Sequence, residues 1–257
     1  MQNDLIEIVF LGTGTSQGVP VIACECDVCT SNDPRDNRLR TSIMLSYRGK
    51  NIVIDSGPDF RQQMLRQKVM HLDAIVYTHE HKDHVAGMDD VRAYNYKQQS
   101  DMQLYGSFRV EEAIRREFHY AFTEKKYPGI PEVVFNRIDN DPFHLLGLHF
   151  IPVEVMHYHL PVQGFRINDI SYITDANYIA PEEIEKIKGS RILIINALRK
   201  QSHPSHFNLE EALQLIEQIK PQQAYLIHIS HLMGKHADVA NELPKGVQIA
   251  WDGLRIC

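Results

Sequence analysis

Four candidate metal ligands lie within six positions of one another. They are His79, His81, Asp83 and His84. The apolar residues 72–78 precede this group and predict a short strand. A loop that follows a strand lets several side chains converge, and imidazole and carboxylate groups together suit zinc, manganese or iron. The motif therefore predicts a metal site, with a polar surface turn as the alternative interpretation.

A second cluster of metal-binding residue types lies near the start of the chain. Cys24, Cys26 and Cys29 offer three thiols, one fewer than a closed tetrahedral zinc site needs. His231 is the candidate fourth ligand, and the four residues together predict a structural zinc site. A disulfide between two of these cysteines, or free thiols, is the alternative. Cys257 is expected to have no role.

The first motif resembles the HxHxDH signature of the metallo-β-lactamase superfamily. The resemblance implies an α/β fold, a four-layer αββα sandwich. It also implies three later ligands in the order His, Asp, His, each at the end of a strand. The sequence supplies His157 after residues 150–155, Asp175 at the end of ISYITD, and His228 at the end of QAYLIH. His159 competes with His157, which is preferred because it lies closer to the end of its strand.

The same resemblance implies that two divalent ions, zinc or manganese, share these ligands. Asp175 bridges the ions, and Asp83 and Asp175 are catalytic as well as ligands. The implied ligands are His79, His81 and His157 for one ion, and Asp83, His84 and His228 for the other. Two such ions can share a hydroxide, lower its pKa and clamp an in-line displacement. Asp55 resembles the family aspartate that orients a ligand loop, with a simple turn residue as the alternative.

The cysteine cluster beside a dinuclear motif resembles the PhnP-type cyclic phosphodiesterases of phosphonate degradation, in which three cysteines and a histidine hold a structural zinc ion. In that type, and in RNase Z, a histidine in the context of His206 acts on the leaving group. General acid catalysis typically contributes ~10²–10⁴-fold in rate. The alternative is that Ser205 or His206 only caps the helix that follows. Arg199 and His203, in the same loop, are further candidates for phosphate contact.

The remaining pattern predicts one domain, residues 1–257, with a lid-like insertion around residues 85–141. Within that stretch, helices are expected near residues 89–99 and 108–118. No internal repeat or linker is visible in the sequence. Strands with helices between them predict two sheets flanked by helices.

Composition limits the classes of function. The chain has 257 residues, 43 % of them hydrophobic and 23 % charged, which suits a sizeable globular core. A net charge of −6 without long runs of like charge disfavours a broad nucleic-acid surface. No apolar stretch reaches the roughly 20 residues of a membrane helix, and the first residues carry no secretory signal. We therefore expect a cytoplasmic enzyme without a membrane partner, and the resemblance adds a homodimer as one option for its assembly.

These features predict a metal-dependent hydrolase, and more specifically a phosphodiesterase. Its expected partner is a small, cyclic or linear, phosphodiester substrate cleaved by the hydroxide that the metals share. The segments LGTGTSQGVP and HFNLEEAL are also similar to RNase Z, the tRNA 3′ processing nuclease, which is the main alternative. Against it, the chain shows no Gly/Pro-rich basic arm, and Pro58 stands where that family typically has Glu. A thioester or lactam hydrolase on the same fold is the remaining alternative.

Overall fold

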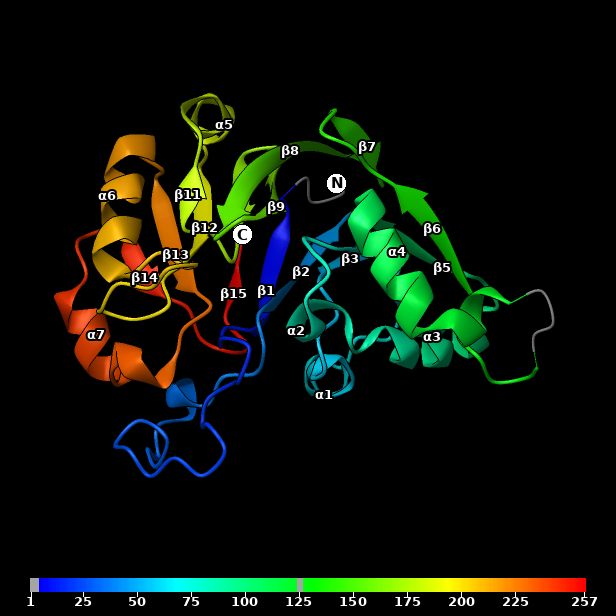
Figure 1. Cartoon of the computed structure of the whole chain (residues 1–257), viewed down its shortest axis with the longest axis horizontal. Helices are drawn as coiled ribbons and strands as arrows, with labels where there is room; N and C mark the ends of the chain where they lie inside the picture. Colours follow the sequence, from blue (N-terminus) through cyan, green and yellow to red (C-terminus); the bar gives the residue numbers. More distant parts are fainter. Residues whose placement is uncertain (1–4, 124–126) are drawn as a thin grey trace. The chain divides into compact units, whose positions relative to one another are not determined.

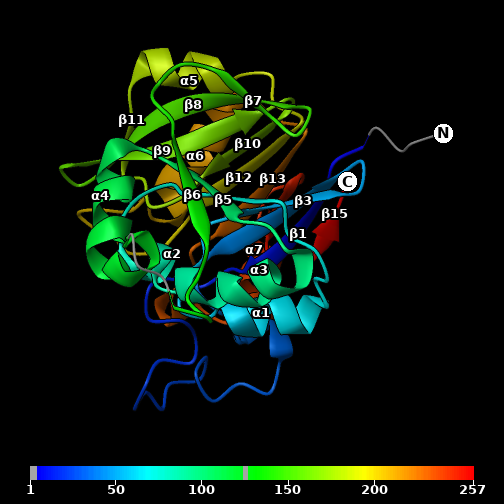
Figure 2. The same cartoon turned by 90° about the vertical axis from the view of Figure 1, so that its right-hand side faces the viewer.

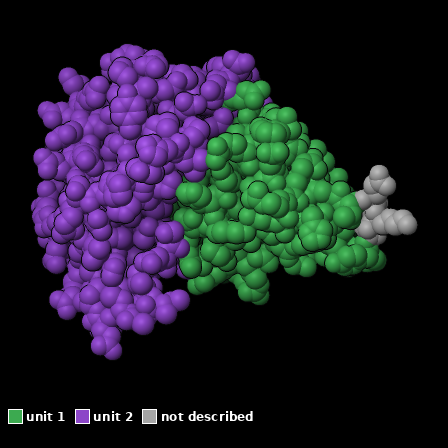
Figure 3. Space-filling model, viewed as in Figure 1, with its two compact units in different colours: residues 1–12, 40–139, 253–257 green, residues 13–39, 140–252 purple. Residues whose placement is uncertain are grey.

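The computed structural model describes residues 5–123 and 127–257. The chain packs as two compact units (Figure 3). Unit 1 comprises Met1–Gly12, Arg40–Asp139 and Gly253–Cys257, and unit 2 comprises Thr13–Leu39 and Asn140–Asp252. The sequence predicts a single domain, whereas each unit has its own sheet and core. Because each unit draws on separated stretches of the sequence, no linker composition marks the division.

Unit 1 is built on a seven-stranded sheet in the order β15-β1-β2-β3-β4-β5-β6 (Figure 1). Its first strands are antiparallel, and β3 to β6 run parallel. The strands are β1 (Glu7–Gly12), β2 (Ser42–Tyr47), β3 (Lys50–Ile54), β4 (Ala74–Val76), β5 (Met102–Gly106), β6 (Val133–Arg137) and β15 (Arg255–Ile256). Since β3 and β4 are parallel neighbours, the residues that follow them, Asp55 and Thr78, meet at one edge of the sheet.

The helices of unit 1 cover one face of this sheet, where their apolar residues join those of the strands in one buried cluster. They are α1 (Phe60–Gln67), α2 (Lys82–Val85), α3 (Arg92–Gln98) and α4 (Phe108–Glu117), with short 3₁₀ helices η2 (Met88–Val91) and η3 (His119–Phe122). Phe60 and Met64 of α1, Tyr94 of α3, and Val110 and Ile114 of α4 all belong to this cluster. The core thereby fixes α2, which carries part of the first metal motif.

Residues 85–141 contain more regular structure than the sequence prediction gave them. The two expected helices are present as α3 and α4, but the stretch also contains β5 and β6, which are full members of the sheet. Most of it is therefore part of unit 1. Both strands have five residues, and the sequence prediction did not include them. Residues 124–126 of the predicted lid lie outside the described residues.

Unit 2 is built on a second sheet, in the order β11-β8-β9-β10-β12-β13-β14, with β7 paired to β8 (Figure 2). Its strands are β7 (Phe143–Leu145), β8 (Leu148–His157), β9 (Leu160–Ile167), β10 (Ile170–Ile173), β11 (Tyr178–Ile179), β12 (Ile192–Asn196), β13 (Gln223–Ile227) and β14 (Val247–Ile249). Strands β10, β12, β13 and β14 are parallel. Their carboxyl ends therefore share one edge, and Asp175 and His228 follow β10 and β13 there.

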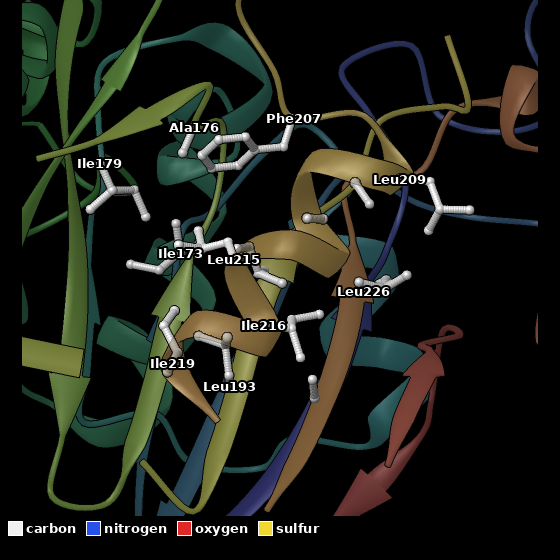
Figure 4. Packing of buried hydrophobic residues seen from close by; sticks show 14 of the residues in the cluster. Ile173, Ala176, Ile179, Leu193, Phe207, Leu209, Leu215, Ile216, Ile219 and Leu226 are labelled. Atoms are coloured by element: carbon white, nitrogen blue, oxygen red, sulfur yellow. The ribbon is translucent and has the colours of Figure 1, made fainter. Parts of the chain in front are cut away.

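The helices of unit 2 are α5 (Pro181–Ile187), α6 (Leu209–Ile219) and α7 (His236–Glu242), with 3₁₀ helices η1 (Pro34–Asp36) and η4 (His231–Met233). Helix α6 packs Leu215, Ile216 and Ile219 onto the sheet (Figure 4). A capping box starts it, because Asn208 accepts from the backbone of Glu211 and Glu211 accepts from the backbone of Asn208. This cap fixes the helix start directly after the segment that carries His206.

The two sheets and their helices agree with the predicted mixed α/β class. No described helix is both long enough and apolar enough to cross a membrane.

Candidate metal centres

In unit 1, the four residues of the HxHxDH motif gather where β4 gives way to α2. The ring of His79 lies 4.6 Å from that of His81 and 4.1 Å from that of His84, measured between centroids. Nε2 of His84 lies 3.2 Å from Oδ2 of Asp83. His79 and His84 are buried, whereas His81 is exposed. The structure thus brings together the ligands that the sequence predicts for this motif.

Asp55 holds the motif in place from the end of the neighbouring strand. Its carboxylate is fully buried and accepts hydrogen bonds from the backbone N–H of Thr78 (2.8 Å), the hydroxyl of Thr78 (2.8 Å) and Nδ1 of His84 (2.7 Å). Burial raises the pKa of Asp55, and the donors of His84 and Thr78 oppose that effect. The residue also has a left-handed φ of 65°, which is costly outside glycine and concentrates at functional sites. Asp55 is therefore more than a turn residue.

These hydrogen bonds decide which ring nitrogen of each histidine can face a metal. The hydroxyl of Thr78 has a single proton and donates it to Asp55, so it must accept from Nδ1 of His79, 3.0 Å away. Nδ1 of His84 likewise donates to Asp55. Both rings therefore carry their proton on Nδ1 and leave Nε2 as the ligand atom, an arrangement typical of metal-binding histidines.

In unit 2, His157, Asp175, His206 and His228 form a second group. Candidate ligand atoms of His157, Asp175 and His206 lie within 4.8 Å of one another. The ring of His206 stacks on that of His228 at 4.7 Å and lies 4.5 Å from that of His157. Nε2 of His228 lies 3.2 Å from Oδ2 of Asp175. Asp175 and His228 both have a φ of 57°, so this group also contains strained residues at strand ends.

His157 fits a metal ligand better than His159. Nδ1 of His157 donates to the backbone carbonyl of Ser205 at 2.8 Å, which leaves Nε2 toward the group. His159 lies in the exposed hairpin turn between β8 and β9, beside Tyr158. The preference for His157, based on its place at the strand end, agrees with this geometry.

His206 lies within the unit 2 group and does not cap a helix. The cap of α6 is Asn208, which removes the capping interpretation of Ser205 and His206. His206 is only 8 % exposed, and its Nδ1 has no hydrogen-bond partner among the described residues. Burial, reinforced by His228, lowers the pKa of His206 to about 3. The ring is therefore neutral at neutral pH in the absence of an added anion or metal ion.

The three cysteines and His231 form a separate centre in unit 2. Nδ1 of His231 lies 3.3, 3.4 and 3.5 Å from the sulfur atoms of Cys24, Cys26 and Cys29. No disulfide joins any two of Cys24, Cys26 and Cys29, so the disulfide alternative is not realised. A hydrogen bond from the backbone of Cys29, followed by one from His231, lowers the pKa of Cys26 to about 6. Burial raises the pKa of Cys29 to about 11.

The donor atoms in each unit have spacings that suit metal ions. Two ligands at about 2.0–2.1 Å from one zinc ion in tetrahedral geometry lie roughly 3.4 Å apart, and sulfur–nitrogen pairs lie slightly farther apart. The Nε2–Oδ2 pairs at 3.2 Å and the sulfur–nitrogen pairs at 3.3–3.5 Å match these values. Histidine with carboxylate suits zinc or manganese, and three thiols with one imidazole suit zinc.

Some supporting residues were not predicted from the sequence. The hydroxyl of Thr78 connects His79 to Asp55 through two hydrogen bonds. Its position directly before the motif could have indicated this role from the sequence. Ser205 acts through its backbone carbonyl, for which side-chain type gives no signal. Asp36 ties the cysteine loop down, because it accepts from Ser31 and from the backbone of His236.

Comparisons with known proteins show which family the chain belongs to. Residues 50–229 match the family model of the beta-lactamase superfamily domain, and the chain belongs to that family. The fold is that of a metallo-β-lactamase fold hydrolase, as the resemblance implies.

Three individual proteins are similar to this chain. The crystal structure of a diphosphatase from the PhnP family has a TM-score of 0.92 and 38 % identity, covering 98 % of this chain and 96 % of that one. An octanoyltransferase from Porphyromonas gingivalis is 41 % identical over 249 residues, which are 96 % of this chain and 50 % of that protein. This chain thus spans half the length of that relative. A ribonuclease Z from Borreliella afzelii is 24 % identical over 301 residues, covering 87 % of this chain and 92 % of that one.

Proposed function

We propose that this chain is a metal-dependent phosphodiesterase that hydrolyses a small phosphodiester. The main observation in support is the position of His206, which is buried against His157 and His228 in the unit 2 group. An imidazole beside two ligands, with its own Nδ1 unpartnered among the described residues, suits proton transfer at a reacting group. The likeness to a PhnP-family diphosphatase supports chemistry at phosphorus.

In this proposal, the ligands are assigned to the two metal ions in the order typical of the superfamily. We assign His79, His81 and His157 to one ion, Asp83, His84 and His228 to a second, and Asp175 to both. Divalent ions bound by these residues would supply an activated water nucleophile and neutralise charge on the phosphoryl oxygens. Asp55 keeps two of the histidines in the correct tautomer. Cys24, Cys26, Cys29 and His231 would hold a structural zinc ion.

In this mechanism His206 gives a proton to the departing oxygen. The proton must first be present on the ring, and burial opposes this by lowering the pKa of His206 to about 3. A phosphodiester anion beside the ring acts in the opposite direction, because a nearby negative charge favours the imidazolium. The negative charge of the bound substrate thereby favours protonation of the buried ring.

The first experiment is hydrolysis of bis-p-nitrophenyl phosphate by the purified chain, with metal analysis on the same sample. Turnover with about three metals per chain, two shared by the catalytic ligands and one on the cysteines, is the expected result. Full metal occupancy without hydrolysis of any phosphodiester would contradict the proposal.

A second candidate is an acyl thioester hydrolase, which the octanoyltransferase relative favours. Octanoyl-coenzyme A hydrolysis, measured on the same metal-loaded sample, separates the two. A value of kcat/KM for the thioester above that for every phosphodiester tested would move the assignment to this candidate. A ribonuclease Z-like activity is tested by adding a precursor tRNA to the same comparison.

A further inference from the structure

The helices α1 and α3 lie next to each other in unit 1 (Figure 2), and a groove of about 540 Å³ lies between them. Most of its lining is apolar and comes from Phe60, Met64, Leu65, Val69, Met70, Ala93 and the ring of Tyr94. The charged part of the lining consists of Arg61, Lys68, Asp90 and Lys97. None of the proposed metal ligands is among these residues, so the groove is separate from them.

Two apolar side chains of the groove are left largely in water. Leu65 is 61 % exposed and Met70 is 65 % exposed, whereas Phe60 and Met64 are buried and form the floor. Methionine adapts its shape to different apolar groups, because its side chain is unbranched and has several rotatable bonds. An apolar group bound in the groove would remove Leu65 and Met70 from water, which is favourable.

The groove is positively charged although the chain as a whole is acidic. The net charge of the chain is −6, but the groove has three cations, Arg61, Lys68 and Lys97, and one carboxyl group, that of Asp90. Burial raises the pKa of Asp90 and the charge of Arg61 opposes this effect, so these two groups face each other. Within the described part of the chain, Lys68 and Lys97 form no ion pair with a carboxylate. Two cations therefore remain for an anionic ligand.

Hydrogen bonds hold the two walls of the groove together. The hydroxyl of Tyr94 on α3 donates to the carbonyl of Val69 at 3.0 Å. The side chain of Gln98, at the end of α3, accepts from the backbone N–H of Leu72 at 2.8 Å and donates to its carbonyl at 2.9 Å. Helix α3 is thus fixed to the segment that follows α1. A site that is already fixed loses little entropy when it binds a ligand.

The floor of the groove is fixed by the backbone that follows the HxHxDH motif. A Cβ at Gly87 would lie 2.7 Å from Cβ of Phe60 and 2.2 Å from the carbonyl oxygen of Gly57, so only glycine allows this close approach. The amide of Gly87 also donates to the carbonyl of Ser56 at 2.8 Å. Phe60 is therefore held in place from below, and the groove does not collapse when it is empty.

The size and lining of the groove restrict its occupant. Its volume lies within the range of about 300–1,000 Å³ that is usual for small-molecule sites. Sugars and bases need neutral hydrogen-bond partners, and among the described residues no Ser, Thr, Asn, Gln or His lines the groove. An apolar floor with lysine side chains beside it suits a molecule with an alkyl chain and a single anionic head.

We propose that this groove binds a medium-chain carboxylate, the anion of a free fatty acid. The alkyl chain lies on Phe60, Met64 and Leu65, and the carboxylate lies near Lys68 and Lys97. The chain supplies most of the affinity through burial, and the carboxylate supplies the preference for an anion. Binding here goes beyond the proposed phosphodiesterase activity and does not depend on it.

The test is calorimetric titration of the metal-loaded protein with acetate, hexanoate, octanoate and decanoate. Acetate reports any binding of a carboxylate at the metal ions. We expect the affinity to rise about fourfold for each methylene added from hexanoate to decanoate. Octanoate should bind about tenfold more tightly than octyltrimethylammonium, because an exposed ion pair and the corresponding repulsion each change affinity a few fold.

Two kinds of variant locate the ligand in the groove. The double variant Lys68→Gln/Lys97→Gln should lose most of the preference for octanoate over the cation. Lys220→Gln is the matched control, because Lys220 ends α6 in the same left-handed conformation in which Lys68 ends α1. Ala93→Phe fills the groove and should abolish binding, whereas Ala240→Phe, at an exposed alanine of α7, should not. Thermal unfolding of each variant shows that it is folded.

The proposal is overturned if octanoate binds no more tightly than acetate or than octyltrimethylammonium, or if Ala93→Phe binds octanoate as the wild type does. Binding to phosphatidylglycerol vesicles without binding of octanoate would show that the groove meets a membrane surface instead. If octanoate does not bind and Ala93→Phe changes the oligomeric state in sedimentation, a second copy of the chain covers the groove, and the proposal is wrong.

Discussion

At the residue scale, Asp55 shows how much of the site depends on a group that touches no substrate. One buried carboxylate accepts from Thr78 twice and from His84 once, and through Thr78 it also fixes His79. An amide in its place has a single acceptor oxygen and an N–H₂ group that would face other donors. The tautomers of two ligands depend on this one residue.

We therefore expect Asp55→Asn to weaken metal binding in the catalytic centre by about 10–100-fold, as is typical when a partner of a ligand is changed. Zinc titration monitored by calorimetry measures this affinity. Asp73→Asn is the matched control, because Asp73 is also a bonded carboxylate of unit 1 but pairs with Lys50 and the backbone of Asn51. Unchanged affinity in Asp55→Asn would contradict the role described for Asp55.

His206→Ala should reduce turnover most for substrates with a poor leaving group. An alkoxide needs a proton as it departs, and we expect a loss of ~10²–10⁴-fold there. p-Nitrophenolate leaves without a proton, so bis-p-nitrophenyl phosphate should lose far less. The comparison of kcat/KM on a methyl ester and on the p-nitrophenyl ester checks this. Equal losses on both would show that His206 does not act as an acid.

At the element scale, strand ends bring the candidate ligands of each unit together. Asp55 and Thr78 follow the parallel neighbours β3 and β4. In unit 2, Asp175 and His228 follow β10 and β13, which flank β12. The parallel order makes these ends coincide, which is why ligands far apart in the sequence can be predicted as one set.

The cysteine loop is the element whose stability depends most on a metal ion. Cys26→Ser should remove zinc from that centre and lower the free energy of unfolding by about 1–3 kcal/mol, because the loop loses a ligand that closes it. Zinc analysis and chemical denaturation measure both effects. Cys257→Ser, at an exposed cysteine that lies outside this centre, should change neither. A Cys26→Ser protein of full stability would reject the structural-zinc proposal.

The start of α6 gives a test that involves no metal. Asn208→Ala removes the side chain that accepts from Glu211, and we expect a loss of about 1 kcal/mol in the free energy of unfolding. Asn208→Asp should cost only a few tenths, because Asp is an equally good cap. Urea denaturation distinguishes the two variants, and equal stabilities would show that the capping box contributes nothing.

At the scale of the whole molecule, the sequence predicted the class of fold, and it also predicted which candidate ligands lie at strand ends, because both rest on residue type and order. His157, Asp175 and His228 each lie where a strand ends, and the cysteines lie with His231. Strands β5 and β6, which have five residues each, were not predicted. The bounds of the two compact units depend on contacts between distant segments, which a single sequence does not reveal.

Removal of metal ions should affect the whole chain. A chelator should abolish hydrolysis and lower the melting temperature, because metals that bind only the folded state stabilise it by mass action. Addition of zinc or manganese should restore both, as followed by calorimetry and by the phosphodiesterase assay. Hydrolysis that persists in a protein shown to be free of metal would reject the metal-dependent mechanism.

The segment that follows β13 carries His228 and, three residues later, His231, and its amide and carbonyl at Ile229 bond to Thr13 and Thr15. Two proposed metal centres thus share one short piece of backbone. Any energetic coupling between them must be reciprocal, so zinc on the cysteines would change the affinity at His228 by the same factor as the reverse. A favourable coupling would make the two centres lose their metal ions together under metal starvation, whereas an unfavourable one would make them lose their ions in turn.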